Sequence, residues 1–209
     1  MDKQVIVCAG MHRSGSTWLY NAVRLIIASS RVPVYACWVN KYKPDDGRKI
    51  HVVKTHLFYP KIREAADCIF TTRRDLRDVA ASAVRKGICR STPMDVLAYL
   101  TRIIDEDYIP WMQSSDFEVP YEDMIRDEPH FIEVLAAFMG FSVDGGEIKA
   151  EIDALDPDDP EALLSPGHIT RREPGTFAET LGLPAIRAVE TAFQGWQEQR
   201  GYSRRHGPS

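Results

Sequence analysis

An eight-residue glycine loop, Gly-Met-His-Arg-Ser-Gly-Ser-Thr at residues 10–17, constrains this chain more than any other feature. The apolar run at residues 5–9 has the character of a short buried strand, and a helical pattern follows at residues 17–29. Strand, glycine loop and helix in this order form a P-loop, where backbone N–H groups and the positive end of the helix dipole converge on an anion. The sequence therefore predicts an anion site for a nucleotide phosphate.

The loop departs from the usual pattern G-x-x-x-x-G-K-[S/T] at one position. Ser16 stands where a P-loop lysine would reach the β- and γ-phosphates of a nucleoside triphosphate. Arg13, inside the loop, offers a cation from another direction. The substitution argues against ordinary ATP or GTP chemistry.

Short apolar runs alternate with helical patterns along the chain, which predicts an α/β fold: a three-layer domain with a parallel sheet flanked by helices. The expected strands are residues 5–9, 32–37, 50–53, 68–72 and 117–120. The expected helices are residues 17–29, 75–86, 94–113, 128–139, 147–155 and 184–200. At 209 residues we expect a single domain over residues 1–209, with a flexible tail at residues 202–209.

Composition and charge exclude several classes of protein. A net charge of −4 provides no global basic field, so we expect no nucleic-acid partner. No apolar run is long enough for a membrane span, and residues 1–4 lead into a strand rather than a signal peptide. Four cysteines without C-x-x-C spacing are typical of reduced core residues. We therefore expect a cytoplasmic protein.

The carboxyl ends of two expected strands are basic. Lys54 and His56 follow the strand at residues 50–53, and Arg74 follows the strand at residues 68–72. Ligands of parallel sheets bind at these ends, where an ATPase or GTPase normally carries an acidic ligand for Mg²⁺. Basic side chains can neutralise phosphates without a divalent ion. The pattern predicts no metal site and favours transfer of a group less charged than a phosphoryl group.

A second anion site is expected at the start of the next helix. Asp75 is a plausible N-cap, and Asp78 completes an acidic first turn. Arg74 lies just before this helix and Ser82 lies two turns into it. A phosphate beside these turns would accept bonds from both side chains. Taken singly, each residue is more often structural than functional.

Together these motifs resemble the sulfotransferases that use 3′-phosphoadenosine 5′-phosphosulfate (PAPS), over most of the chain. Residues 13–19 are similar to the family's 5′-phosphosulfate loop, K-S-G-T-T-W-L, and residues 54–57 match its K-T-H-L segment. Residues 74–82 are similar to R-N-P-K-D-V-A-V-S, whose arginine and last serine hold the 3′-phosphate. Residues 121–124 resemble Y-E-D-M, whose tyrosine lies near the adenine. Four ordered motifs make the resemblance specific.

The resemblance implies a sulfotransferase-like fold and a reaction. The sulfuryl group of PAPS would move to a hydroxyl or amine on a small or extended acceptor, leaving adenosine 3′,5′-bisphosphate, with no metal required. His56 would be the general base, while Lys54 and Arg13 offset charge on the transferring group. The implied cofactor-binding residues are Arg13, Ser14, Gly15, Ser16, Thr17, Trp18, Arg74, Ser82, Tyr121, Arg171 and Arg172.

The chain departs from the family pattern in three places. Arg13 stands where the cytosolic branch has a lysine, although other branches carry arginine there. The segment R-K-G-x-x-G-D-W is eroded at residues 170–177, where Arg171 or Arg172 is still a candidate for the 3′-phosphate. The dimer signature of the animal cytosolic enzymes is not evident after Phe177, so we expect no dimer of that type.

Two other functions remain open from the sequence. A small P-loop kinase for a metabolite or nucleotide would need Mg²⁺-dependent ATP turnover, which the missing loop lysine and strand-end carboxylate disfavour. A nucleotide-binding module without catalysis would keep the anion sites but would have no need of His56. Two residues near the loop are ambiguous: His12 has no assigned role and is expected to be exposed, and Trp18 without the resemblance would be a core residue.

Overall fold

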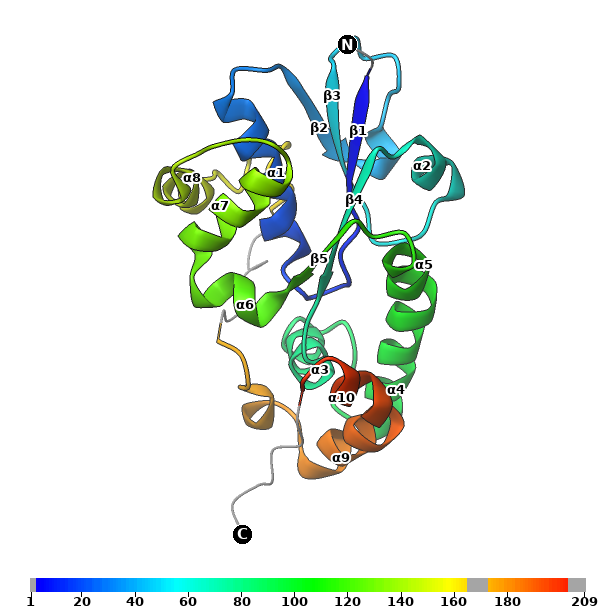
Figure 1. The fold of residues 1–209 in the computed structure, drawn as a ribbon. Coiled ribbons are helices and arrows are strands. Elements are labelled where there is room, and N and C mark those ends of the chain that lie inside the picture. Colours follow the sequence, from blue (N-terminus) through cyan, green and yellow to red (C-terminus); the bar gives the residue numbers. More distant parts are fainter. Residues whose placement is uncertain (1–2, 165–172, 203–209) are drawn as a thin grey trace. The chain divides into compact units, whose positions relative to one another are not determined.

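A computed structural model describes residues 3–164 and 173–202 of the chain (Figure 1). The chain divides into two compact units. The first contains Met1–Arg73 and Glu106–His168, and the second contains Arg74–Asp105 and Ile169–Ser209.

The first unit is built on a five-stranded parallel sheet with the strand order β2-β3-β1-β4-β5 (Figure 1). The strands are β1 (Gln4–Cys8), β2 (Val34–Trp38), β3 (Ile50–Lys54), β4 (Cys68–Arg73) and β5 (Phe117–Pro120). Central β1 pairs with β3 on one side and β4 on the other. In chain order, β2 and β3 lie on one side of β1, and β4 and β5 lie on the other side. The carboxyl end of β1 is therefore the topological switch point, where such sheets bind ligands.

Helices cover both faces of this sheet. They are α1 (Ser16–Ser29), α2 (Pro60–Ala65), α5 (Ile109–Met112), α6 (Tyr121–Arg126), α7 (Glu128–Phe138) and α8 (Gly145–Asp153). Successive strand residues point to opposite faces, so Ile6 belongs to the apolar core with α1, α7 and α8, whereas Val5 and Val7 pack with Trp111 and Ile62. The predicted parallel sheet flanked by helices is confirmed.

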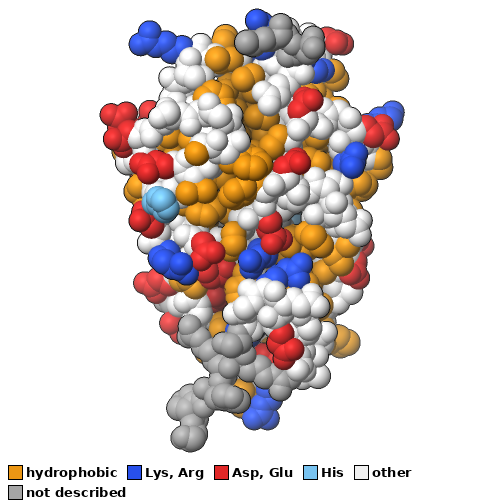
Figure 2. Space-filling view, in the orientation of Figure 1, with side chains coloured by type: hydrophobic (Ala, Val, Ile, Leu, Met, Phe, Trp, Pro, Cys, Tyr) orange, Lys and Arg blue, Asp and Glu red, His pale blue; other side chains and the backbone are white. Residues whose placement is uncertain are grey.

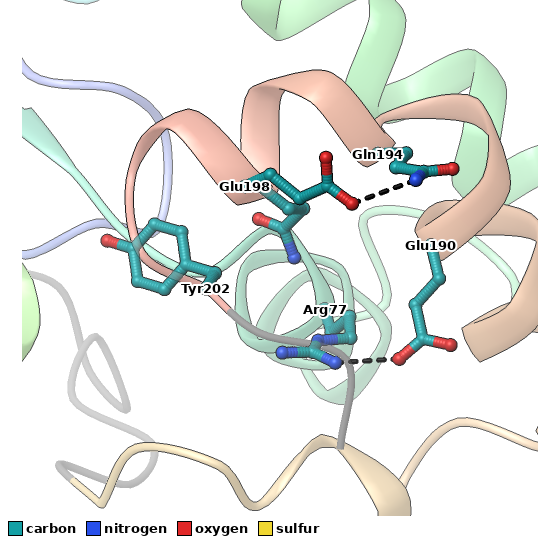
Figure 3. A pocket seen from close by; sticks show the side chains of 6 residues that line it. Arg77, Glu190, Gln194, Glu198 and Tyr202 are labelled. Atoms are coloured by element: carbon teal, nitrogen blue, oxygen red, sulfur yellow. Dashed lines mark hydrogen bonds and ion pairs between the residues drawn. The ribbon is translucent and has the colours of Figure 1, made fainter. Parts of the chain in front are cut away.

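The described part of the second unit is helical. Its helices are α3 (Leu76–Arg85), α4 (Pro93–Arg102), α9 (Leu183–Ala192) and α10 (Gln194–Gln199), with a 3₁₀ turn at Phe177–Glu179. As predicted, Asp75 caps α3, because its carboxylate accepts the N–H of Arg77 at 2.9 Å. The Arg77 guanidinium lies 2.7 Å from Asp75 and 2.7 Å from Glu190 of α9. Figure 3 shows Arg77 and Glu190 beside Gln194, where they line a small hollow.

The structure differs from the predicted helix at residues 94–113. The helix contains a π-helical segment at Ile103–Tyr108, between α4 and α5. Pro110, which lacks a backbone N–H, follows this segment closely and removes one donor from the regular hydrogen-bond series. The helix expected at residues 184–200 is likewise two helices, α9 and α10, which meet at Phe193. The sequence did not predict the six-residue helices α2 and α6.

All four cysteines carry free thiols. Cys8 and Cys37 are buried as predicted, whereas Cys68 and Cys89 are only half-buried. Within residues 3–164 and 173–202, no helix combines the length and apolar character needed to cross a bilayer. On the face shown in Figure 2, acidic and basic side chains are interspersed.

Candidate active site

Two glycines shape the loop between β1 and α1. A Cβ atom at Gly10 would lie 2.2 Å from Thr72 Oγ1 and 2.4 Å from Ser16 Cβ, so no larger residue fits. Gly15 caps α1 with a φ of 86°, and a Cβ there would lie 2.9 Å from the Tyr121 ring. Left-handed backbone and close packing both select glycine at this position. The strand, loop and helix occur in the order that the sequence predicts.

Ser14 fastens the loop to the neighbouring strand β4. Its buried hydroxyl donates to the carbonyl of Met11 at 2.6 Å and also contacts the hydroxyl of Thr72. The N–H of Met11 donates to the carbonyl of Thr72 at 3.2 Å. The Ser14 side chain therefore holds the loop in place, which leaves its backbone N–H as the group available to the predicted ligand.

Lys54 brings a buried ammonium group to this loop. The residue ends β3, where it pairs with Cys8 of β1 and Trp38 of β2, and it is 1% exposed. Its Nζ lies 3.5 Å from Ser16 Oγ at the start of α1 and 4.9 Å from the centre of the Trp38 ring. Burial lowers the pKa of Lys54 to about 7, and the charge of Arg13 acts in the same direction.

The electrostatics of the loop fit an anion. The first turn of α1 contains no acidic residue, so its N-terminal dipole adds to the charges of Lys54 and Arg13. Arg13 also has a left-handed φ of 62°, which costs on the order of 1 kcal/mol in a residue with a Cβ atom. Like charges held together in a partly dry site repel, and an anion between them removes the repulsion.

His56, the predicted base, is hydrogen-bonded to the same loop. Its Nδ1 donates to the carbonyl of Gly10 at 2.6 Å, because a carbonyl oxygen only accepts. In the neutral ring the lone pair is then on Nε2, the arrangement that a general base requires. The Trp38 ring meets His56 edge-on, with 5.4 Å between the ring centroids. The structure therefore brings His56, Lys54 and the loop together.

His12 differs from its sequence expectation. Its side chain is 29% exposed, and its ring lies 4.0 Å from that of His56, measured between centroids. Its Nε2 is 3.6 Å from Oδ2 of Asp107, a residue of the π-helical segment that is 1% exposed. The sequence reasoning missed both residues of this pair. The only feature of the sequence that could have indicated this contact is the position of His12 next to Arg13.

The resemblance assigns both Trp18 and Tyr121 to the cofactor, and the two side chains have different surroundings. Tyr121 begins α6 directly after β5, is 6% exposed, and packs its ring against Gly15 of the loop. Trp18 is half-buried against the apolar core, and its Nε1–H donates to Glu128 at 2.9 Å. Tyr121 thus contacts the loop itself, whereas Trp18 is anchored to α7.

The two arginines at the end of β4, Arg73 in the strand and Arg74 directly after it, have different surroundings. Arg73 lies in the first unit, where its Nε donates to Glu118 of β5 at 2.7 Å, and Glu118 also accepts the hydroxyl of Tyr108. Arg74 begins the second unit and is 3% exposed, next to Asp75 at the N-terminus of α3. The sequence reasoning assigned Arg74, rather than Arg73, to the ligand.

The predicted 3′-phosphate residues begin the second unit. Ser82 of α3 is 1% exposed. Between Arg74 and Ser82 in sequence lies Asp78, which accepts the N–H of Gly175 at 2.6 Å. Burial raises the pKa of Asp78, and the charge of Arg74 opposes this shift. The other two predicted residues, Arg171 and Arg172, lie outside the described residues.

No protein-family model matches this sequence, and no curated protein matches it in sequence. Solved structures do match its fold. Retinol dehydratase in complex with retinol and PAP aligns with a TM-score of 0.63 and 15% identity, covering 100% of this chain and 84% of that one. The complex of retinol dehydratase with androsterone and PAP gives 0.61 and 16%, covering 98% and 82%.

Mouse sulfotransferase SULT7A1, complexed with PAP, aligns with a TM-score of 0.65 and 18% identity, covering 96% of this chain and 85% of that one. At such identities the likeness is one of fold. The chain therefore has the α/β fold of the sulfotransferases.

Proposed function

We propose that this protein is a PAPS-dependent sulfotransferase that transfers a sulfuryl group to a hydroxyl or amine acceptor, with His56 as the general base. One observation supports the proposal: the buried amino group of Lys54 and the ring of His56 both contact the loop between β1 and α1. The solved neighbours bind PAP, which is adenosine 3′,5′-bisphosphate, the product left when PAPS gives up its sulfuryl group.

The residues of the loop fit the 5′ end of PAPS. Backbone N–H groups of residues 14–17 and the ammonium of Lys54 would hold the 5′-phosphosulfate, with Arg13 as a further cation. Tyr121, packed on Gly15, would lie near the adenine.

The 3′-phosphate would be held by the second unit. Arg74 and Ser82 are both buried polar residues; Arg74 lies just before α3, where the helix dipole favours a negative charge, and Ser82 lies two turns into the helix. Arg171 or Arg172 would add a further cation.

Bound PAPS supplies an activated sulfuryl group, attached to its 5′-phosphate through a bridging oxygen. In the proposed reaction, Nε2 of His56 accepts the proton of the acceptor hydroxyl while that oxygen forms a bond to sulfur. The bond from sulfur to the bridging oxygen breaks in line with the attack. Lys54 and Arg13 offset the charge that develops on this oxygen, and the bond from Nδ1 of His56 to Gly10 holds the ring in orientation.

The exposed apolar residues after His56 favour an acceptor with an apolar carbon skeleton. Leu57 and Tyr59 are exposed at 46% and 39%, although large apolar side chains are usually buried. They follow the base directly in sequence. We therefore propose an alcohol, phenol or amine whose carbon skeleton covers these two side chains.

The experiment is transfer of label from [³⁵S]PAPS to a panel of alcohols, phenols and amines, using the full chain. The proposal predicts a labelled product that depends on His56 and forms without added Mg²⁺. His130→Ala is the matched control, because the side chain of His130 is 70% exposed. Transfer from [γ-³²P]ATP in place of PAPS would indicate the kinase, and tight PAP binding without any transfer would indicate a binding module.

A further inference from the structure

We infer that His12 and Asp107 are positioning residues for His56: Asp107 holds a proton on His12, and the charged ring of His12 keeps His56 in the neutral form that a base needs. The catalytic part of this inference rests on the proposed function. The charge states themselves do not, since they can be measured in the protein without a substrate.

Asp107, His12 and His56 form a row of three side chains. Oδ2 of Asp107 is 3.6 Å from Nε2 of His12, and the ring of His12 is 4.0 Å from the ring of His56, with 45° between the ring planes. His56 in turn donates to the carbonyl of Gly10. The row therefore runs from a carboxylate, through one imidazole, to the proposed base.

The π-helical segment brings the carboxylate into this row. Asp107 is 1% exposed, whereas its neighbours Asp105 and Glu106 in the same segment are exposed. π-helical turns are rare, and they occur frequently at functional sites. A buried carboxylate is costly unless a cation accompanies it, and the imidazole of His12, 3.6 Å away, provides such a cation when it binds a proton.

The charge on His12 then acts on His56. Two protonated rings at this separation repel, so the pair binds its first proton more readily than its second. The other charged groups around His56 act in the same direction: Arg13 belongs to the same loop as His12, and Lys54 ends β3 beside Trp38. The exposed carboxylates Asp105 and Glu106 are screened by water. We place the shared proton on His12, because the carboxylate contacts that ring.

The test is an NMR titration of the histidine ring signals of the full chain without ligand, with His12 and His56 assigned by substitution. His12→Phe keeps an aromatic ring beside His56 but cannot carry a charge. The inference predicts that the titration midpoint of His56 rises by about one to three pH units in this variant, the range for a like charge at roughly 4 Å between full exposure to water and a site near a protein surface. His130→Phe, at an exposed histidine, is expected to leave the midpoint unchanged.

Asp107→Asn provides an independent readout, because it keeps the shape of the side chain but removes its charge. The inference predicts that His12 then titrates at a lower pH than in the original protein. An unchanged His56 midpoint in His12→Phe, or an unchanged His12 midpoint in Asp107→Asn, would overturn the inference. If His12→Phe does not fold, the titration of Asp107→Asn decides the question alone.

Kinetics separate this inference from the proposed function. With PAPS and an acceptor, the acid limb of kcat/KM is expected to move to higher pH in His12→Phe, by the same amount as the His56 midpoint, while the rate at high pH is retained. A uniform loss of rate with no displacement of the limb would assign His12 a structural role and refute the positioning role. If no sulfuryl transfer occurs at all, the proposed function fails, and the NMR titrations still decide the charge states.

Discussion

Binding of PAP is expected to be coupled to protonation of Lys54. This follows from the buried position of the ammonium, which lowers its pKa from 10.5 to about 7. At pH 8 only about one molecule in ten then carries a proton on Lys54. An anion bound against Nζ favours the charged form and brings the pKa back toward its ordinary value. Nearly every Lys54 side chain is then charged in the complex.

The expected proton uptake is about 0.9 per bound PAP at pH 8, about 0.5 at pH 7 and about 0.1 at pH 6. The assay is isothermal titration calorimetry of PAP into the full chain, in buffers of different ionisation enthalpy that contain no phosphate. At pH 8 the slope of the observed heat against ionisation enthalpy gives the number of protons taken up. At this pH the phosphates of PAP are already ionised, so they contribute little.

Lys54→Met is the matched variant, because methionine is apolar and has a similar length. We expect this variant to bind PAP more weakly and to take up almost no proton at pH 8. Lys3→Met, at an exposed lysine, is expected to behave like the original protein. An uptake near zero in the original protein, or equal uptake in Lys54→Met, would refute the claim that Lys54 is a buried and largely neutral amine that receives the anion.

Three further predictions concern the anion sites. Gly10→Ala is expected to lower the free energy of unfolding by roughly 1–3 kcal/mol in urea titrations and to weaken PAP binding, because its Cβ would meet Thr72 at 2.2 Å; unchanged stability would contradict the tight loop. The folded pKa of Lys54 is depressed, so the unfolded chain binds the additional proton between about pH 7 and 10.5 and stability rises with pH across that window. Lys54→Met should flatten this rise and increase the free energy of unfolding by up to about 5 kcal/mol at pH 7. An identical slope of stability against pH in both proteins would contradict a buried amine at Lys54. Ser82→Ala should weaken PAP binding about tenfold in calorimetry but leave AMP binding unchanged, since AMP lacks a 3′-phosphate; equal losses for both ligands would remove Ser82 from the 3′-phosphate site.

The central strands β1, β3 and β4 were predictable because each contains a short run of residues that is buried on both faces of the sheet. The expected strand at residues 117–120 coincides with β5, and the ends of the other strands lie within two residues of the prediction. The largest difference is at β2, which begins after Pro33 rather than before it. Proline cannot donate to a sheet ladder, so a regular strand begins more easily beyond it.

The helical connection from α4 to α5 was less predictable. Its apolar spacing reads as one helix, but the hydrogen-bond pattern changes at Ile103–Tyr108, which turns Asp107 into the interior. Periodicity alone cannot distinguish α-helical from π-helical turns over six residues.

The proximity of the loop, Lys54 and His56 was predictable because strand ends in a parallel sheet meet at one edge. The contact of His12 with Asp107 was not, because the two residues are 95 positions apart (107 − 12 = 95) and no motif links them. Local sequence patterns likewise could not predict the hydrogen bond from the Trp18 indole to Glu128, because this bond joins α1 to α7. Such contacts depend on packing between elements.

The central claim is that this loop supports sulfuryl transfer with His56 as the base, and label transfer from [³⁵S]PAPS tests it most directly. The account predicts transfer to an acceptor by the original protein, with turnover about 10² to 10⁴ lower in His56→Ala and PAP affinity retained. Full turnover in His56→Ala would contradict the assignment of the base. PAP binding by the original protein without transfer to any acceptor would contradict the proposed reaction.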